Sequence, residues 1–233
     1  MKLILKKRPK NVTIIEGFPG FGLIGTIATE YLLDHLETEK IGLIQIDEIP
    51  AMIAIHQNKV VEPISLHYNK KYNLVIVHAI NIGKNMGWQL AEVIDDLAKQ
   101  LTAKEVISLE GVGSPNTEGG RVFYYSSQKQ VKKLENVAKP LMEGIIVGVT
   151  GALLARDMST PVVALFAEAR SNLPDSKAAA SIIQALDVYC GLQIDAAPLM
   201  KQAQMFEKKL KDIIKKGNQA EVVNEDKRLS YVG

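Results

Sequence analysis

The feature that most constrains the fold is a short apolar run that leads through a glycine-rich turn into an amphipathic segment. The run covers residues 12–15, and the turn after it, residues 16–25, reads Glu-Gly-Phe-Pro-Gly-Phe-Gly-Leu-Ile-Gly. Beyond the turn, apolar residues recur at the spacing of one helix face, which predicts a helix over residues 23–36. A strand that passes through glycines into a helix is typical of α/β proteins.

Three glycines of this turn match a known cofactor pattern. Gly20, Gly22 and Gly25 have the G-x-G-x-x-G spacing that lets a dinucleotide pyrophosphate approach a helix N-terminus. A dinucleotide-binding unit also needs a crossover helix after its second strand. Residues 51–56 and 60–67 instead alternate and turn like a hairpin or meander. We therefore interpret the glycines as backbone and packing residues and expect no cofactor, with a cofactor role as the alternative.

The rest of the chain alternates between strand-like and helix-like segments. Further strands are predicted over residues 41–46, 51–56, 60–67, 74–79, 105–109, 121–125, 145–149 and 162–167, and further helices over 87–101, 128–142, 152–157, 176–189 and 198–216. Several of these strands are continuously apolar, as when helices cover both faces of a sheet. The sequence therefore predicts a three-layer α/β/α sandwich with a mixed sheet. We expect one domain over residues 1–216 and a flexible tail over 217–233.

The composition limits the classes of partner. The chain has 233 residues, 47% of them hydrophobic, which is enough for one large core. A formal net charge of +2 gives no electrostatic footprint for nucleic acid, and the basic N-terminal residues are interpreted as a solvated strand edge. No uncharged run is long enough for a bilayer span, and no signal peptide is recognisable. We expect a cytoplasmic protein with neither nucleic-acid nor membrane partners.

Candidate catalytic and metal-binding side chains are scattered. The four histidines (His35, His56, His67, His78) have no H-E-x-x-H or C-x-x-C partner, so no metal site is predicted. The lone Cys190 ends an apolar helix face and is interpreted as a structural thiol. An enzyme would have to use polar groups at the strand ends. Its fallback pocket comprises Gly20, Gly22, Glu110, Asn116 and Glu168.

A more specific signal comes from four segments. These are residues 17–31 (Gly-Phe-Pro-Gly-Phe-Gly-Leu-Ile-Gly-Thr-Ile-Ala-Thr-Glu-Tyr), 110–116 (Glu-Gly-Val-Gly-Ser-Pro-Asn), 148–154 (Gly-Val-Thr-Gly-Ala-Leu-Leu), and 166–170 followed by 175–180. In content and order they resemble the archaeal branch of the proteasome assembly chaperone 2 family. The resemblance spans nearly the whole chain.

The resemblance carries expectations about fold and function. It implies a sandwich like that of nucleoside phosphorylases, and a non-enzymatic assembly chaperone or activator-like factor that binds the α-ring of the proteasome core particle. It also implies a symmetric homo-oligomer. The alternative is a small-molecule enzyme of the nucleoside-phosphorylase type or an ATP-dependent carboxylate–amine ligase. Against a ligase, the chain has no Walker-type phosphate loop.

The end of the chain is the expected docking element. After a polar stretch, apolar residues reappear as Leu229, Tyr231 and Val232, with Gly233 last. Proteasome activators and chaperones commonly end in hydrophobic–Tyr–any, which inserts between α subunits. Here Tyr231 is third from the end, so the ending resembles that motif without satisfying it. We expect these four residues to bind the partner; an end without a role is the alternative.

Overall fold

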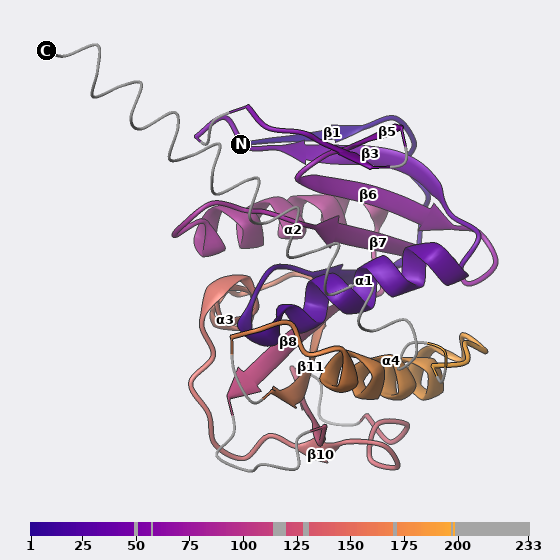
Figure 1. Ribbon diagram of the computed structural model, residues 1–233, viewed down its shortest axis with the longest axis vertical. Coiled ribbons are helices and arrows are strands. Elements are labelled where there is room, and N and C mark those ends of the chain that lie inside the picture. Colours follow the sequence, from indigo (N-terminus) through magenta and orange to yellow (C-terminus); the bar gives the residue numbers. More distant parts are fainter. Residues whose placement is uncertain are drawn as a thin grey trace, which may run out of the picture.

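A nine-stranded mixed sheet forms the middle of the molecule (Figure 1). The computed structural model describes residues 1–48, 51–56, 58–113, 120–127, 131–169, 172–196 and 198. Within them the strand order is β1-β3-β6-β7-β2-β8-β11-β9-β10. The bounds are β1 Lys2–Leu5, β2 Thr13–Gly17, β3 Glu39–Gln45, β6 Ile64–Asn69, β7 Leu74–Ala79, β8 Glu105–Gly113, β9 Val122–Ser126, β10 Lys139–Pro140 and β11 Val162–Ala169.

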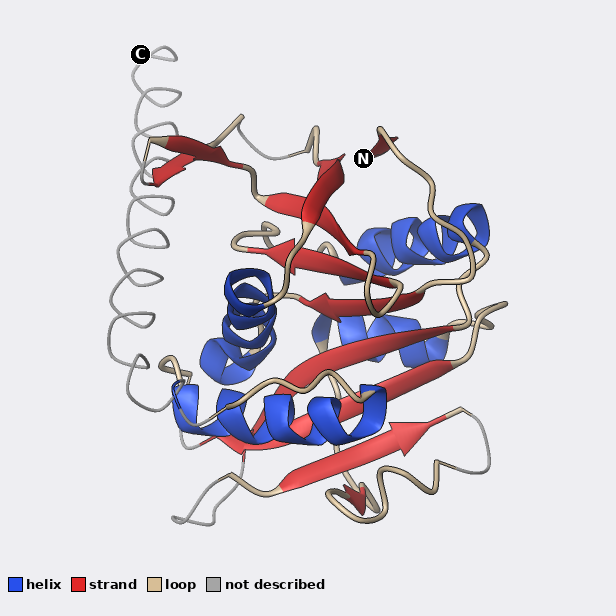
Figure 2. Cartoon of the chain, turned by 90° about the vertical axis from the view of Figure 1, so that its right-hand side faces the viewer, coloured by secondary structure: helices blue, strands red, loops and turns tan. Residues whose placement is uncertain are grey.

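Helices cover both faces of this sheet, as the sequence predicts (Figure 2). Helices α1 (Ile24–His35) and α4 (Ser176–Cys190) pack on one face, and α2 (Gly87–Leu101) and α3 (Gly148–Ala155) pack on the other. A short 3-10 turn, η1 (Phe21–Leu23), leads into α1. The three-layer α/β/α sandwich with a mixed sheet is confirmed.

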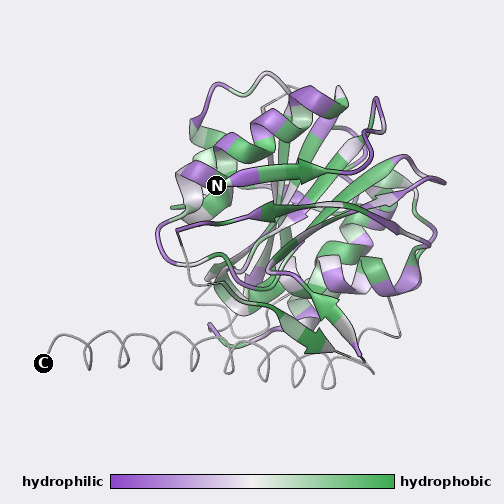
Figure 3. Cartoon of the chain, turned by 90° about the horizontal axis from the view of Figure 1, so that it is seen from above, coloured by the Kyte–Doolittle hydropathy of each residue, from purple (hydrophilic) through white to green (hydrophobic). Residues whose placement is uncertain are grey.

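Alternation along the central strands divides the apolar residues between two cores. Ile15 and Ile107 point into the core under α1 and α4, whereas Ile14 and Val106 point into the core under α2 and α3. All four side chains are fully buried. This two-sided burial explains the continuously apolar strands. In Figure 3 the strands in the middle of the molecule are mostly green, for hydrophobic residues, and purple gathers in peripheral loops.

The directions of the strands decide where a site can form. The four central strands β7, β2, β8 and β11 are parallel, so their carboxyl ends meet at one edge of the sheet. Antiparallel strands β6, β3 and β1 continue the sheet on one side, and β9 on the other. A separate hairpin joins β4 (Ala54–His56) to β5 (Lys59–Val61). Ligand sites of such sheets usually lie beyond the carboxyl ends of the parallel strands.

The strand order also bears on the dinucleotide alternative. In a dinucleotide-binding unit the strand after the first helix lies beside the glycine-turn strand, but here β3 is separated from β2 by β6 and β7. Asp47, which follows β3, lies 4.0 Å from the N-terminal ammonium of Met1. The hairpin predicted after it is present as β4–β5. The basic N-terminus forms edge strand β1, with Lys2 exposed, as predicted.

Three predicted elements are wrong. The strand predicted over residues 60–67 is two strands, β5 of the separate hairpin and β6 of the main sheet. A helix was predicted over residues 128–142, but residues 132–137 form turns closed by bonds such as Leu134 N to Val131 O (2.8 Å), and Lys139–Pro140 is the strand β10. Pro140 lacks the N–H that a continuing helix needs. A strand was predicted over 145–149, but Ile145 is 93% exposed and α3 begins at Gly148. Residues 128–130 lie outside the described residues, as does all of the helix predicted over 198–216 except Pro198.

Candidate functional site

The glycine turn brings helix α1 against the end of β8. A Cβ on Gly25 would lie 2.4 Å from the Leu109 carbonyl oxygen, and one on Gly20 would lie 2.1 Å from Oε1 of Glu110. Gly22 has φ of +67°, a conformation that glycine adopts without strain. These contacts support the interpretation of the glycines as packing residues. They also leave the Glu110 carboxyl in direct contact with the turn.

A cavity of about 570 Å³ lies at the carboxyl ends of the parallel strands. Of the fallback-pocket residues, Gly20, Glu110 and Glu168 line it, and Gly22 lies in the adjoining η1 turn. Asn116 lies outside the described residues. We call this space the strand-end cavity. The structure thus brings together the strand-end carboxylates and the glycine turn that the sequence singled out.

Glu110 lies at the inner side of the strand-end cavity. Its Oε1 accepts a hydrogen bond from the Gly111 amide (2.9 Å), and its Oε2 accepts one from the Thr150 hydroxyl (3.3 Å). Glu110 is buried, and burial raises its pKa to about 7. Hydrogen bonds from nearby amides and from Thr150 partly oppose this increase in pKa. A carboxyl with this pKa changes charge near neutral pH.

A second buried acid, Glu16, was not recognised from the sequence. It lies on β2 beside Ser108 of β8, and Ser108 contacts Thr150 at 2.8 Å. Glu16 is fully buried, and burial raises its pKa to about 8. Within the described chain neither carboxyl oxygen of Glu16 has a hydrogen bond of normal geometry. Ser108 and the Phe18 amide lie close enough to lower the pKa of Glu16, but burial outweighs them. The sequence did contain a signal for this buried acid: Glu16 interrupts an apolar strand and lies on the same strand face as Ile14.

Glu168 differs from these two acids because it has a basic partner. Arg121 donates to it twice, from Nε to Oε2 (2.8 Å) and from an Nη to Oε1 (2.6 Å). The Glu168 side chain is buried, whereas the Arg121 side chain is 56% exposed. The bidentate pair neutralises this carboxylate at the outer side of the cavity.

The outer wall of the strand-end cavity is an apolar loop between β10 and α3. Met142, Ile145 and Val147 line it and are also 86%, 93% and 74% exposed. Leaving such side chains in water contributes nothing to folding. The apolar side chains of this loop are therefore accessible to a molecule that binds at the carboxyl end of the sheet.

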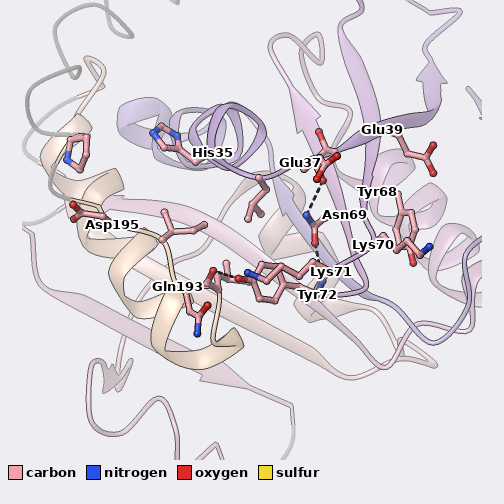
Figure 4. A pocket seen from close by; sticks show the side chains of 15 residues that line it. His35, Glu37, Glu39, Tyr68, Asn69, Lys70, Lys71, Tyr72, Gln193 and Asp195 are labelled. Atoms are coloured by element: carbon pink, nitrogen blue, oxygen red, sulfur yellow. Dashed lines mark hydrogen bonds between the residues drawn. The ribbon is translucent and has the colours of Figure 1, made fainter.

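A second cavity, of about 670 Å³, lies at the opposite end of the sheet (Figure 4). It is formed by the end of α1, the β6–β7 turn and the segment after α4. Asn69 connects parts of the cavity wall: its Nδ2 donates to the Glu37 carbonyl oxygen (2.8 Å) and its Oδ1 accepts from the Tyr72 amide (2.8 Å). Pro198 lines the same cavity.

Beside this second cavity the segment after α4 is held by hydrogen bonds. The Tyr31 hydroxyl donates to the Asp195 carbonyl oxygen (2.7 Å), the Tyr72 hydroxyl donates to that of Leu192, and the Ile194 amide donates to Oδ1 of Asp187 (2.9 Å). The segment leading to Pro198 is therefore held against the fold. The predicted docking residues Leu229, Tyr231, Val232 and Gly233 lie outside the described residues.

His35, His67 and His78 have local contacts. His78 is buried, with Nδ1 2.9 Å from the Thr29 hydroxyl and Nε2 3.0 Å from Glu30. Burial lowers the pKa of His67 to about 4. His35 is exposed in the last turn of α1 and stacks on Tyr31.

Neither the thiol nor a metal cluster offers a reactive centre in the described part of the chain. Burial raises the pKa of Cys190 to about 12, so this thiol stays protonated at neutral pH. No group of three or more potential metal-ligating side chains comes together there. Among the described helices, none has both the length and the apolarity that crossing a membrane requires.

Comparison with known proteins gives matches over most of the chain. The model of the PAC2 family matches residues 14–214. Pyrococcus furiosus PbaA, described as an archaeal homolog of proteasome-assembly chaperone, is 29% identical; the match covers 94% of this chain and 98% of PbaA, with a TM-score of 0.82. An uncharacterized protein of Methanocaldococcus jannaschii is 27% identical over 218 residues, which are 91% of this chain and 90% of the relative.

One further solved structure is similar in fold. Pyrococcus furiosus PbaB, described as an archaeal proteasome activator, superposes with a TM-score of 0.74 at 24% identity, over 91% of this chain and 98% of PbaB. Together the matches cover both the glycine turn and the segments that form the strand-end cavity.

Proposed function

The chain belongs to the PAC2 family, and from this membership we propose that it is a non-enzymatic proteasome assembly chaperone or activator-like factor. In this proposal it binds the α-ring of the proteasome core particle and associates with itself into a symmetric homo-oligomer. The observation that carries the proposal is the likeness, over nearly the whole of both chains, to PbaA, an archaeal homolog of proteasome-assembly chaperone.

We further propose that docking uses the end of the chain, with residues 1–216 as the sandwich domain and 217–233 as the tail. The fixed position of the segment before Pro198 supports tail docking. Because hydrogen bonds from Tyr31 and Tyr72 hold the segment before Pro198, residues beyond it start from a defined place on the fold. Several tails on one oligomer that meet a ring of like pockets gain affinity through effective concentration.

The test is a binding assay between the full chain and recombinant proteasome α subunits, with Tyr231→Ala as the variant. If the Tyr231 ring fills a pocket, its removal weakens binding at least about tenfold, or about 1.4 kcal/mol per docking event. The matched control is Tyr125→Ala, which removes a tyrosine that is 48% exposed on β9 of the sandwich. The control is expected to bind as well as the wild type.

Two results would contradict the proposal at different levels. If Tyr231→Ala and a chain truncated after Arg228 both bind as tightly as the wild type, the tail is not the docking element and the sandwich surface must be. If the wild type does not bind α subunits at all, the proposed function is wrong. Adding β subunits separates the two roles, since a chaperone speeds core-particle assembly and an activator raises the peptidase activity of finished particles.

A further inference from the structure

The strand-end cavity has charge of one sign only. Among the described residues that line it, those with charged side chains are Glu110, Glu143 and Glu168. Glu168 is paired with Arg121, and Glu143 lies on an exposed loop. Glu110 is only 9% exposed, and no lysine, arginine or histidine of the described chain forms an ion pair with it. The one buried, unneutralised carboxyl on the cavity wall is therefore that of Glu110.

A second buried acid, Glu16, lies next to Glu110. Glu16 pairs with Ser108, so on neighbouring strand β8 Glu110 lies two residues further toward the carboxyl end. Both acids lie on the face covered by α3, and the charge of Glu110 raises the pKa of Glu16. Burying one carboxyl without a basic partner is costly, and burying two side by side more so. None of the ion pairs in the described chain involves either acid, so none offsets the cost of ionising them.

The remaining wall of the cavity is apolar. Phe18, Phe21, Ile82, Phe123, Ile146 and Val149 line it. The Gly20 backbone packs against the Glu110 carboxyl, where a side chain would clash with Oε1, and the Gly111 amide donates to the same oxygen. At about 570 Å³ the space is within the range of small-molecule sites, which are typically apolar with a few placed polar groups.

We propose that the strand-end cavity binds a small organic cation, a primary ammonium on an apolar alkyl or aryl body. The ammonium donates hydrogen bonds to Glu110, and the body packs against the phenylalanines of the β2–α1 turn and β9. Binding favours the ionised carboxylate, so the proton that Glu110 holds is released to solvent as the ligand enters. This site is independent of the tail, and it implies no catalytic step.

The first test uses three probes of matched shape on the wild-type full chain: 2-phenylethylamine, 2-phenylethanol and 3-phenylpropionate. Calorimetry and ligand-dependent melting measure the binding of each. The amine is expected to bind saturably and at least tenfold tighter than the alcohol, and the carboxylate is expected not to compete. Because Glu110 ionises with a pKa of about 7, amine affinity should rise about tenfold between pH 6 and pH 8 while that of the alcohol stays constant.

The second test uses variants. Glu110→Gln keeps the shape of the side chain and should abolish both the preference for the amine and its pH dependence. Glu92→Gln, on the exposed side of α2, is the matched control and should bind like the wild type. If Glu110→Gln does not fold, Val112→Phe, which keeps Glu110 but fills part of the cavity, should weaken the amine and the alcohol alike.

Three outcomes overturn the proposal: equal affinity for the amine and the alcohol, no saturable binding of the amine at millimolar concentration, or undiminished amine binding by a folded Glu110→Gln. A pull-down with α subunits on the same samples tests the proposed function separately. Loss of one activity therefore does not imply loss of the other.

Discussion

Glu16 is a buried acid whose protonation is linked to folding. An acid held in an apolar strand between two sheet neighbours stays neutral in the native state over a wide pH range, since its pKa there is about 8 rather than 4.5. The native state therefore holds a proton that the unfolded chain has already lost. Stability contributed in this way is complete below the unfolded pKa and is lost as pH rises through the folded pKa.

We predict that the thermal midpoint of the wild type falls between pH 5 and pH 8 and that Glu16→Gln has a flatter profile. The slope that one such group adds is at most about 1.4 kcal/mol of unfolding free energy per pH unit. The measurement is thermal or denaturant unfolding of both proteins at pH 5, 6.5 and 8. Parallel profiles would show that Glu16 is not protonated in the native state.

At this scale the sequence is informative about residues whose role is local. Asp175 directly precedes the helix predicted over residues 176–189 and caps it, since its carboxylate accepts the Ala178 amide at 3.0 Å. The role of Glu16 depends instead on which strand lies beside it and on Thr150, more than a hundred residues away. Spacing along the chain does not encode that neighbour, so the buried pair of acids emerged only with the sheet register.

Among the elements, the β2–α1 connection has the strictest backbone requirement. Gly22 has φ of +67°, and a Cβ there would lie 3.0 Å from the Cβ of Ala169. We predict that Gly22→Ala lowers stability by about 1 kcal/mol or more, because alanine is strained in this conformation. The expected decrease in melting temperature is about 2–4 °C. Gly144→Ala, whose added Cβ would come no closer than 3.4 Å to a neighbour, is the control and should change little.

The same melting assay tests the cofactor alternative for this turn. NAD and ATP at submillimolar concentration are expected to leave the melting temperature of the wild type unchanged. A saturable increase with either nucleotide would revive the enzyme interpretation, in which the turn holds phosphate.

The accuracy of the predicted elements follows from how they are stabilised. Helix α2 has the predicted bounds because it carries a complete helical periodicity, and strand β7 has them because its continuous apolar run is bounded by turns. Residues 128–142 and 145–149 were misassigned because most of their apolar residues lie in turns or in an exposed loop. Val131 and Leu134 do point into the α1–α4 core, but from turns, and the run around Ile145 crosses the strand ends as an exposed loop. Short apolar runs do not distinguish these cases.

For the molecule as a whole, we predict a homo-oligomer in solution that does not depend on the tail. Closed symmetry is the usual outcome when one chain associates with itself. Residues 217–233 are mostly polar and charged, and are poorly suited to an intersubunit core. Sedimentation or light scattering at micromolar concentration should give the same oligomer for the full chain and for a chain truncated after Lys216. A monomeric full chain would refute self-association, and dissociation on truncation would place the interface in the tail.

The strand order has a consequence for the order of events during synthesis. Strand β2 lies at the middle of the sheet, but its partners begin at Leu74 and Glu105, so neither has been made when β2 leaves the ribosome. At about 5–20 residues per second, roughly 5–20 s pass before β8 follows. During this interval Ile14 and Ile15, fully buried in the finished fold, lack their neighbours on β8. A factor proposed to guide the assembly of other chains therefore itself passes through a period in which its central strand is open to incorrect pairing.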